Sequence, residues 1–229
     1  MNKIGIIFAM KEELDELLNI VNLIDKINIY DLTIYKCILN NKELYLVESG
    51  VGKVNAARTT QILIDNIKVE YIFNIGVAGS VNNDVNVLDI VIADKLVQHD
   101  FDITSFDHEK GYIPNVGIYI NTDEYLLNKC INTDINTNKH VGVIASGDIF
   151  CQDKKMSNKI GNKFNALCVE MEGASIAQVC HLCNIPFIVI RSISDSPNTN
   201  DNNKITYEEF LTKSCKIVAN YLKDIINNM

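Results

Sequence analysis

The segment PFIVIRSISD occupies residues 186–195. Its first half is an almost unbroken apolar run, which is typical of a β-strand buried on both faces of a sheet. Arg191, Ser194 and Asp195 follow at the end of this strand, at the carboxyl edge where open α/β folds bind their ligands. Asp195 is therefore a candidate general acid. In the alternative, structural interpretation, Asp195 caps the next segment and Arg191 pairs with a carboxylate.

A second acidic strand end, VEMEG at residues 169–173, precedes this segment in the chain. Because strand ends that meet at one edge of a sheet lie close together, two acidic ends of this kind indicate a single site. We therefore expect Glu172 and Asp195 to face the same cavity.

Runs rich in Val and Ile predict further strands, and between several of them apolar residues recur near the helical period. The length of 229 residues suits one large domain, given a prior of roughly 150 residues per domain. The chain, residues 1–229, is predicted to be one α/β domain, a three-layer α/β/α sandwich around a mixed, twisted sheet. The expected strands are 3–9, 43–49, 70–75, 88–94, 141–145, 166–170 and 186–192; the expected helices are 11–22, 53–67, 153–163, 172–183 and 207–227.

The composition excludes several classes of partner. The formal net charge is -8, and no block of Lys or Arg occurs, whereas nucleic acids and anionic membranes require clustered cations. No apolar run reaches the length of about 18 residues that a membrane span needs, and the first run, residues 4–9, is too short for a signal peptide. We expect a cytoplasmic protein that binds neither nucleic acid nor membrane.

Cysteine and histidine usage predicts neither disulfides nor a metal site. Seven cysteines lie in apolar contexts, which favours reduced, buried thiols. The pair Cys180 and Cys183 has zinc-like spacing but lies in a predicted helix and has no second pair to match. His99, Asp100 and Asp102 lack a fourth ligand.

Two glycine-rich segments, SGVGK at residues 49–53 and NIGVAGS at residues 74–80, follow predicted strands. The first lacks the upstream glycine and the Ser or Thr of a phosphate-binding loop, and the second lacks the third glycine of a dinucleotide-binding motif. We expect turns in which the backbone approaches a ligand closely, with no nucleotide cofactor.

Read in order, GIIFAMKEE at residues 5–13, SGDIF at 146–150, VEMEG at 169–173 and RSISD at 191–195, together with the two glycine-rich segments, resemble one family. It is the nucleoside phosphorylase/hydrolase superfamily, and most closely the 5'-methylthioadenosine/S-adenosylhomocysteine nucleosidases. The resemblance extends from Ile4 to Phe210. It implies a nucleoside phosphorylase-like fold, no cofactor or metal, adenine nucleoside thioethers as substrates and a place in methionine salvage.

The resemblance also implies roles for individual residues. Cleavage of an N-glycosidic bond to adenine needs a proton for the departing base and an activated water. Asp195 would supply the proton to N7, and Glu13 would deprotonate the water. Glu172 would bind the ribose 2' and 3' hydroxyls, and Arg191 would hold Glu172 and the water in place.

The remaining expected contacts surround the substrate. Ser194 would position Asp195, and Phe150 would stack on adenine. The other expected contacts are Met171 beneath the ribose, the Cys151 backbone at the adenine edge, and Met10, Val51 and Phe210 in the pocket. Val77 stands where many relatives carry Ser, which removes a hydroxyl from near the sugar.

The loop bearing Phe106 and Pro114 would cross a two-fold axis to close the alkylthio pocket of the partner. Tyr112, Ile113 and Pro114 are apolar residues in an otherwise polar segment, which is consistent with a patch that needs a partner. We therefore expect a homodimer. The alternative is a loop that packs on its own domain.

Three other functions compete with this one. A purine nucleoside phosphorylase would need arginines at its phosphate site, and the only arginines are Arg58 and Arg191. A futalosine-type or AMP-cleaving nucleosidase is a second enzyme class. A ligand-binding module with an inactive site would have lost Asp195 or Glu13, and both are present. Methylthioadenosine, S-adenosylhomocysteine and 5'-deoxyadenosine all stay open as substrates.

Overall fold

Strand β5 (Tyr71–Ser80) lies in the middle of the sheet and pairs with β1, β10 and β9. The computed structural model describes residues 2–151, 153–196 and 203–229. In it, β5 pairs in parallel with β1 (Lys3–Phe8) on one side and with β10 (Phe187–Asp195) on the other. The end of β5 also pairs with β9 (Ala166–Glu170), in antiparallel orientation. Segments from the start, the middle and the end of the chain therefore meet around β5.

The remaining strands extend from β5 in two directions. On one side the order is β1, β4, β3, β2; on the other, β10, β6, β8 and β9 return to β5, so that these five strands form a closed ring. Parallel and antiparallel pairs both occur, as predicted for a mixed sheet. The bounds are β2 (Asn22–Ile29), β3 (Leu32–Leu39), β4 (Lys42–Glu48), β6 (Ile90–Gln98), β7 (Ile120–Asn121) and β8 (Lys139–Ser146).

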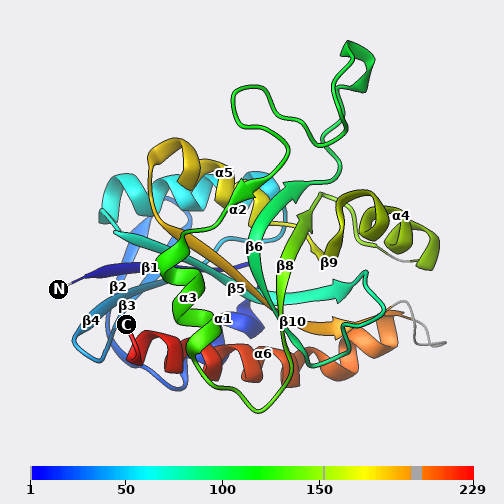
Figure 1. The fold of residues 1–229 in the computed structure, drawn as a ribbon. Helices are drawn as coiled ribbons and strands as arrows, with labels where there is room; N and C mark the ends of the chain where they lie inside the picture. The colour runs from blue at the N-terminus through cyan, green and yellow to red at the C-terminus, as the bar shows by residue number, and fades with distance from the viewer. Residues whose placement is uncertain (1, 152, 197–202) are drawn as a thin grey trace.

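Helices cover both faces of the sheet, which confirms the predicted three layers (Figure 1). On one face α2 (Lys53–Ile62), continued by a π-helical turn (Leu63–Ile67), packs on α5 (Gly173–Cys183). On the other face α6 (Asn203–Asn227) packs on β10 and on α1 (Lys11–Leu18). The two remaining α-helices, α3 (Glu124–Asn132) and α4 (Lys154–Phe164), cover the half of the sheet that contains β6, β8 and β9.

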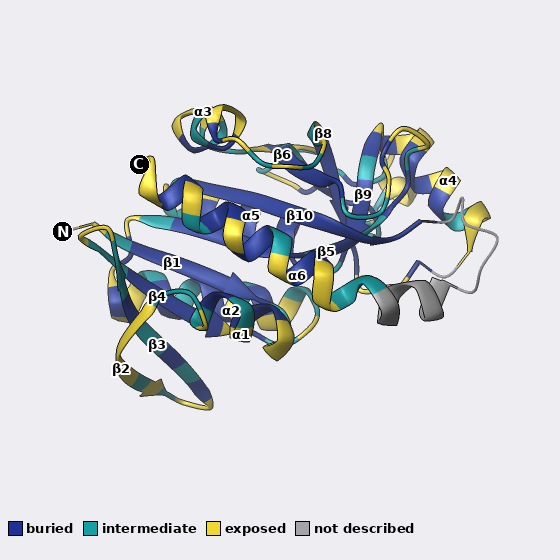
Figure 2. Cartoon of the chain, turned by 90° about the horizontal axis from the view of Figure 1, so that it is seen from below, coloured by how far each residue is buried: buried dark blue, intermediate teal, exposed yellow. Residues whose placement is uncertain are grey.

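Apolar side chains fill the space between these layers. The central strands β1, β5 and β10 are buried on both faces, while exposed residues lie on the outer sides of the helices and on β2 (Figure 2). Ile6 and Phe73 pack towards α1 and α6, whereas Ile7 and Ile72 pack towards α2 and α5. This double burial explains why the strand sequences are nearly continuous apolar runs rather than alternating ones.

Several predicted bounds differ from the structure. The helix predicted for residues 11–22 ends at Leu18, because residues from Asn22 onward join β2. The segment Asn74–Ser80, predicted to be a turn, is instead the second half of β5, where it pairs with β10. Likewise β10 continues to Asp195 and does not end at residue 192.

The strands β2, β3 and β7 and the helix α3 were not predicted. A two-residue turn, Asn40 and Asn41, connects β3 to β4; its φ values are 47° and 59°. Two consecutive left-handed Asn residues form the type of two-residue turn that matches strand twist in hairpins. Helix α3 begins at a recognisable cap, since the Asp123 carboxylate accepts a hydrogen bond of 2.9 Å from the Leu126 N–H.

The segment between β6 and β7, which includes the short helical turn Thr104–Phe106, extends away from the body of the molecule (Figure 1). We refer to residues 99–119 as the arm. Phe106 on the arm is 76% exposed. Within the described residues, no helix combines the length and the apolarity needed to cross a bilayer.

The packing of α4 on the sheet depends on a glycine. A Cβ at Gly161 would lie 2.4 Å from the backbone carbonyl oxygen of Val81, whereas a Cβ at Gly142 would meet the side chain of Leu167 at 2.8 Å. We expect Gly161→Ala to lower the free energy of unfolding by about 1–3 kcal/mol, because α4 must move away from the backbone at Val81, just after β5. Gly142→Ala should cost less, because Leu167 can change rotamer. Urea unfolding of both variants tests this, and equal midpoints would contradict it.

Candidate active site

A cavity of about 370 Å³ opens where β1, β5, β9 and β10 end. Most of the site residues predicted from the sequence line it, although they come from distant parts of the chain. Its walls also include Ala9, Ala78, Gly79, Val169 and Glu170. The predicted residues that line it are Met10, Glu13, Val51, Val77, Phe150, Met171, Glu172, Ser194 and Asp195.

Glu13, on the first turn of α1, is buried at the back of this cavity, with 3% of its surface exposed. One carboxylate oxygen accepts hydrogen bonds from the backbone N–H groups of Ala9 and Met10, at 3.0 and 3.1 Å, and the other accepts one from Val77 at 3.0 Å. Burial raises the pKa of Glu13, while the charge of Arg191 and these three N–H groups act against the rise. The carboxylate is therefore rigidly oriented and shifted toward the basicity of a proton acceptor.

Asp195 ends β10 on another wall of the cavity, with 5% of its surface exposed. The Ser194 hydroxyl donates a hydrogen bond of 2.8 Å to Asp195 Oδ1, as expected of a residue that positions the acid. Burial raises the pKa of Asp195, opposed by the Ser194 hydrogen bond. A raised pKa lets a carboxylic acid keep its proton nearer to neutral pH.

Glu172 occupies the N-cap position of α5, two residues after the end of β9. Its Oε1 accepts a hydrogen bond of 2.8 Å from the Gly52 N–H, which joins it to the segment before α2. Burial, and after it the nearby Glu170 carboxylate, raise the pKa of Glu172 to about 7. At neutral pH this group is therefore balanced between its neutral and charged forms.

Arg191 pairs with Glu170 and not, as the sequence led us to expect, with Glu172. Its guanidinium is buried and donates hydrogen bonds to the Glu170 carboxylate and to the side chain of Asn74. Glu170 in turn accepts hydrogen bonds from the N–H groups of Glu172 and Gly173, at 3.1 and 2.8 Å. Because β9 ends at Glu170, its carboxylate reaches Arg191, and the next turn carries Glu172 into the cavity.

Glu170 is the principal residue that sequence reasoning missed. It stands in the VEMEG segment, but only Glu172 was assigned a role there. The structure gives Glu170 contacts with Arg191, Ser146 and the start of α5, and it also lines the cavity. The signal in the sequence was the alternation Glu-Met-Glu, in which a strand end and a helix cap each carry one carboxylate.

Two glycines of β5 make room for the catalytic candidates. A Cβ at Gly76 would lie 2.6 Å from a carboxylate oxygen of Glu13, and a Cβ at Gly79 would lie 2.9 Å from one of Asp195. Any other residue at these positions would displace the carboxylate beside it. The glycine-rich segment therefore serves close approach of a strand to two side chains, within β5 and not in a turn.

The other predicted residues do not line the cavity of the single chain. Cys151 is buried next to Phe150 with its Sγ 3.2 Å from the Ser157 hydroxyl. Phe210 lies on α6, where the Lys213 ammonium is 5.3 Å from its ring centre. Phe106 and Pro114 lie on the arm.

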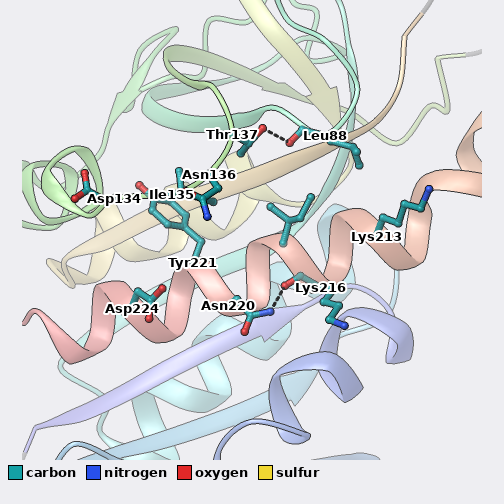
Figure 3. Close-up of a pocket in the computed structure, with 11 residues that line it drawn as sticks. Leu88, Asp134, Ile135, Asn136, Thr137, Lys213, Lys216, Asn220, Tyr221 and Asp224 are labelled. Carbon is teal, nitrogen blue, oxygen red and sulfur yellow. Dashed lines mark hydrogen bonds between the residues drawn. The ribbon is translucent and has the colours of Figure 1, made fainter.

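A second cavity, of about 550 Å³, lies between α6 and residues 134–137 (Figure 3). Lys213, Lys216 and Asp224 line it from α6, and Tyr221 contributes its ring. None of the predicted site residues lines this cavity. Despite its smaller volume, the first cavity is the candidate active site, because buried carboxylates with raised pKa values gather there.

The sequence predicted no metal centre, and the structure shows where the Cys and Asp side chains considered as ligands lie. Cys180 and Cys183 lie in α5, and Asp100 pairs with Lys53 at 2.7 Å. Among residues 2–151, 153–196 and 203–229, no group of three or more His, Cys, Asp or Glu side chains is arranged to hold a metal ion.

The chain is similar to proteins of known activity along its whole length. An aminodeoxyfutalosine nucleosidase of Helicobacter pylori is 36% identical over 234 residues, which cover both chains completely. A 5'-methylthioadenosine/S-adenosylhomocysteine nucleosidase of Staphylococcus aureus is 35% identical over 229 residues, 99% of this chain and 100% of the relative.

A solved structure extends the similarity to the fold. The Helicobacter pylori 5'-methylthioadenosine/S-adenosylhomocysteine nucleosidase with butyl-thio-DADMe-Immucillin-A superposes with a TM-score of 0.94 at 37% identity, covering 100% of this chain and 99% of that one. The family model of the phosphorylase superfamily matches residues 3–227. The chain thus belongs to the phosphorylase superfamily and, within it, is an enzyme of the nucleosidase type.

Proposed function

We propose that the protein hydrolyses the N-glycosidic bond of 5'-methylthioadenosine and S-adenosylhomocysteine, releasing adenine and the 5'-substituted ribose. One observation carries this proposal: two buried carboxyl groups, Glu13 and Asp195, line the same cavity, and both have raised pKa values. In the reaction, the bond between C1' and N9 breaks, and a water oxygen forms the new bond to C1'.

In this mechanism Asp195 acts as the general acid. When N7 is protonated, adenine can take the electrons of the breaking bond and leave as a neutral molecule. This lowers the barrier to its departure. Asp195 is suited to this role because burial disfavours its charged form and the Ser194 hydroxyl fixes its orientation.

Glu13 acts on the attacking water. Its carboxylate is fixed by three backbone N–H groups, and it faces the cavity from α1. As the water attacks C1', Glu13 accepts its proton. Because Asp195 gives up a proton and Glu13 gains one, the pair is restored when Glu13 releases its proton to solvent and Asp195 takes one up.

The charge of the cavity favours a cationic transition state. Glu13, Glu170, Glu172 and Asp195 line it. Within the described residues, Arg191 pairs with Glu170 and acts electrostatically on Glu13 and Glu172. The sugar acquires positive charge as the glycosidic bond breaks. Carboxylates held in a poorly solvated cavity stabilise that charge more than water would.

We infer the ribose and adenine contacts from the remaining lining residues and from Cys151, which follows Phe150 but does not itself line the cavity. Glu172 accepts hydrogen bonds from the 2' and 3' hydroxyls, with Met171 packed below the sugar. Phe150 stacks on adenine, whose edge is read by the backbone of Cys151. Met10 and Val51 bound the 5' substituent, near Val77.

Water is favoured over phosphate as the nucleophile because neither arginine of the chain is available to an anion. Arg191 is committed to Glu170 and Asn74 in the core, and Arg58 pairs with Asp31 on the outer surface of α2. Phosphorolysis would need positive groups where Glu13 and Glu172 lie.

Phe106 and Pro114, both exposed on the arm, support a homodimer in which they close the alkylthio pocket of the partner, with Phe210 nearby. Ile113, which we expected in the same apolar patch, is instead buried within the single chain. Phe106 is 76% exposed in the single chain, which is unusual for a phenylalanine unless a partner covers it. We place the enzyme in the cytoplasm, in methionine salvage.

Hydrolysis of aminodeoxyfutalosine is a second candidate, because the Helicobacter pylori relative named for that substrate is 36% identical over both full chains. The two functions share the adenine and ribose contacts and differ in the 5' substituent. Parallel assays with both nucleosides and with 5'-deoxyadenosine decide between them.

The proposed function predicts release of adenine from methylthioadenosine in phosphate-free buffer, at a rate that added phosphate leaves unchanged. Chromatography of the products should show free methylthioribose. A rate that depends on phosphate, with methylthioribose 1-phosphate as the product, would contradict hydrolysis.

Asp195→Asn should lower kcat by roughly 10²- to 10⁴-fold, because the amide has no proton to give to N7. The melting temperature should stay close to that of the wild type, since the amide fits the same space. Ser194→Ala, which removes only the hydrogen bond to the acid, should have a smaller effect. If Asp195→Asn turns over at the wild-type rate, another group is the acid.

The variants Glu13→Gln and Glu172→Gln should lose different kinetic parameters. Glu13→Gln should bind a substrate analogue normally and lose kcat, because an amide cannot accept the proton of water. Glu172→Gln should lose kcat/KM by roughly 10- to 100-fold, as expected for a charge-assisted hydrogen bond of about 1.5–3 kcal/mol, together with discrimination against 2'-deoxy analogues.

The pH profile separates the two roles further. Since the pKa of Glu172 is about 7, its charged form is lost as the pH falls through 7, so kcat/KM should fall there. That step should be absent from Glu172→Gln. Equal losses in both variants without a change in 2'-deoxy discrimination would show that Glu172 is only structural.

A further inference from the structure

The mouth of the cavity is formed by two segments that are far apart in the sequence. Val51 precedes α2 and Phe150 follows β8, and each is about half exposed although it lines the cavity. The carboxylates behind them are almost completely buried. The spacing of these two segments therefore sets how a nucleoside is enclosed.

A group of three charged residues joins the two segments. The backbone N–H of Lys53 donates to the Asp148 carboxylate at 2.8 Å, so the start of α2 is tied to the segment before Phe150. The Lys53 ammonium donates to Asp100 Oδ1 at 2.7 Å, and the Asp148 N–H donates to Asp100 Oδ2 at 3.0 Å. Asp100 thus accepts one hydrogen bond from each side of the mouth.

The group is anchored to β6 and α5, at the point where the arm begins. Asp100 follows the end of β6, and Gln98, the last residue of β6, accepts a second hydrogen bond from the Lys53 ammonium at 3.2 Å. Gln98 also donates to Gln178 on α5 at 2.7 Å. The residue beside Lys53, Gly52, donates to Glu172.

This arrangement differs from an ordinary surface ion pair. The side chains of Lys53 and Asp100 are 17% and 18% exposed, so water screens their attraction only in part. Each of the charged groups also has a backbone partner or a second acceptor, which restricts its geometry.

We propose that Lys53, Asp100 and Asp148 form a clasp that holds Val51 and Phe150 at the spacing needed to enclose the nucleoside. This inference rests on the proposed function and adds three positioning residues to it. The clasp touches neither the acid nor the water-activating carboxylate. It acts through the two walls of the mouth, on substrate binding and not on the chemical step.

The test uses Asp100→Asn, which removes the charge and one acceptor with little change in volume. The KM for methylthioadenosine should rise roughly tenfold, as expected when a charge-assisted contact is lost, while kcat stays within about twofold. The dissociation constant of 5'-methylthiotubercidin, in which carbon replaces N7, should rise by the same factor in calorimetry. Lys53→Met should match it, and Lys53→Arg should retain most of the affinity.

Asp31→Asn is the control, because Asp31 pairs with Arg58 on α2 and belongs neither to the clasp nor to the lining of the candidate active site. It should leave both constants unchanged. Asp148→Ala provides a second route if Asp100→Asn melts early, since the Asp148 side chain is exposed. The double variant Lys53→Met with Asp100→Asn should bind the nucleoside with the same affinity as either single variant, as expected of coupled residues.

Two results would overturn the clasp: affinities in Asp100→Asn and Asp148→Ala equal to those of Asp31→Asn, or a fall in kcat at constant KM. Failure of the proposed function gives a different result. In that case the wild-type enzyme itself releases no adenine from methylthioadenosine, whatever the variants do.

Discussion

The ion pair between Arg191 and Glu170 is the interaction on which the site depends. Arg191 is buried among Glu13, Glu170 and Glu172, and their charges raise its pKa although burial acts to lower it. Without the guanidinium, several carboxylates would share a dry space, and removal of one partner from a buried pair typically costs about 3–5 kcal/mol. The pair also connects β10 to the end of β9, and so holds the acidic strand ends at one edge of the sheet.

Much of the architecture was predictable because the strands are buried on both faces. Runs such as Phe187–Ile190 carry a strong signal, and their polar ends indicated Asp195 and Glu172 as site residues before their positions were known. The hairpin of β2 and β3 gave a weaker signal, since β2 is largely exposed and its residues alternate only in part. The exposed edge of a sheet is specified by its neighbours more than by its own sequence.

Details of the site could not be predicted where they depend on distances between segments. The partner of Arg191 is decided by the point at which β9 ends, so Glu170 and Glu172 could not be distinguished from their spacing alone. The role of Gly76 and Gly79 is another example, because the side chains that need the space come from α1 and β10. Contacts between Asp100 and the mouth of the cavity likewise arise only after β6 and β8 have paired.

The pairing of β5 with both β1 and β10 has a consequence for folding. Glu13 follows the first strand of the chain and Asp195 ends the last one, so the candidate site exists only after the two ends have closed on β5. Contacts of such large sequence separation form slowly, because loop-closure entropy is lost before they are gained. A nucleoside that binds this site binds only the completed sheet, and its binding free energy therefore adds to the stability of the entire fold.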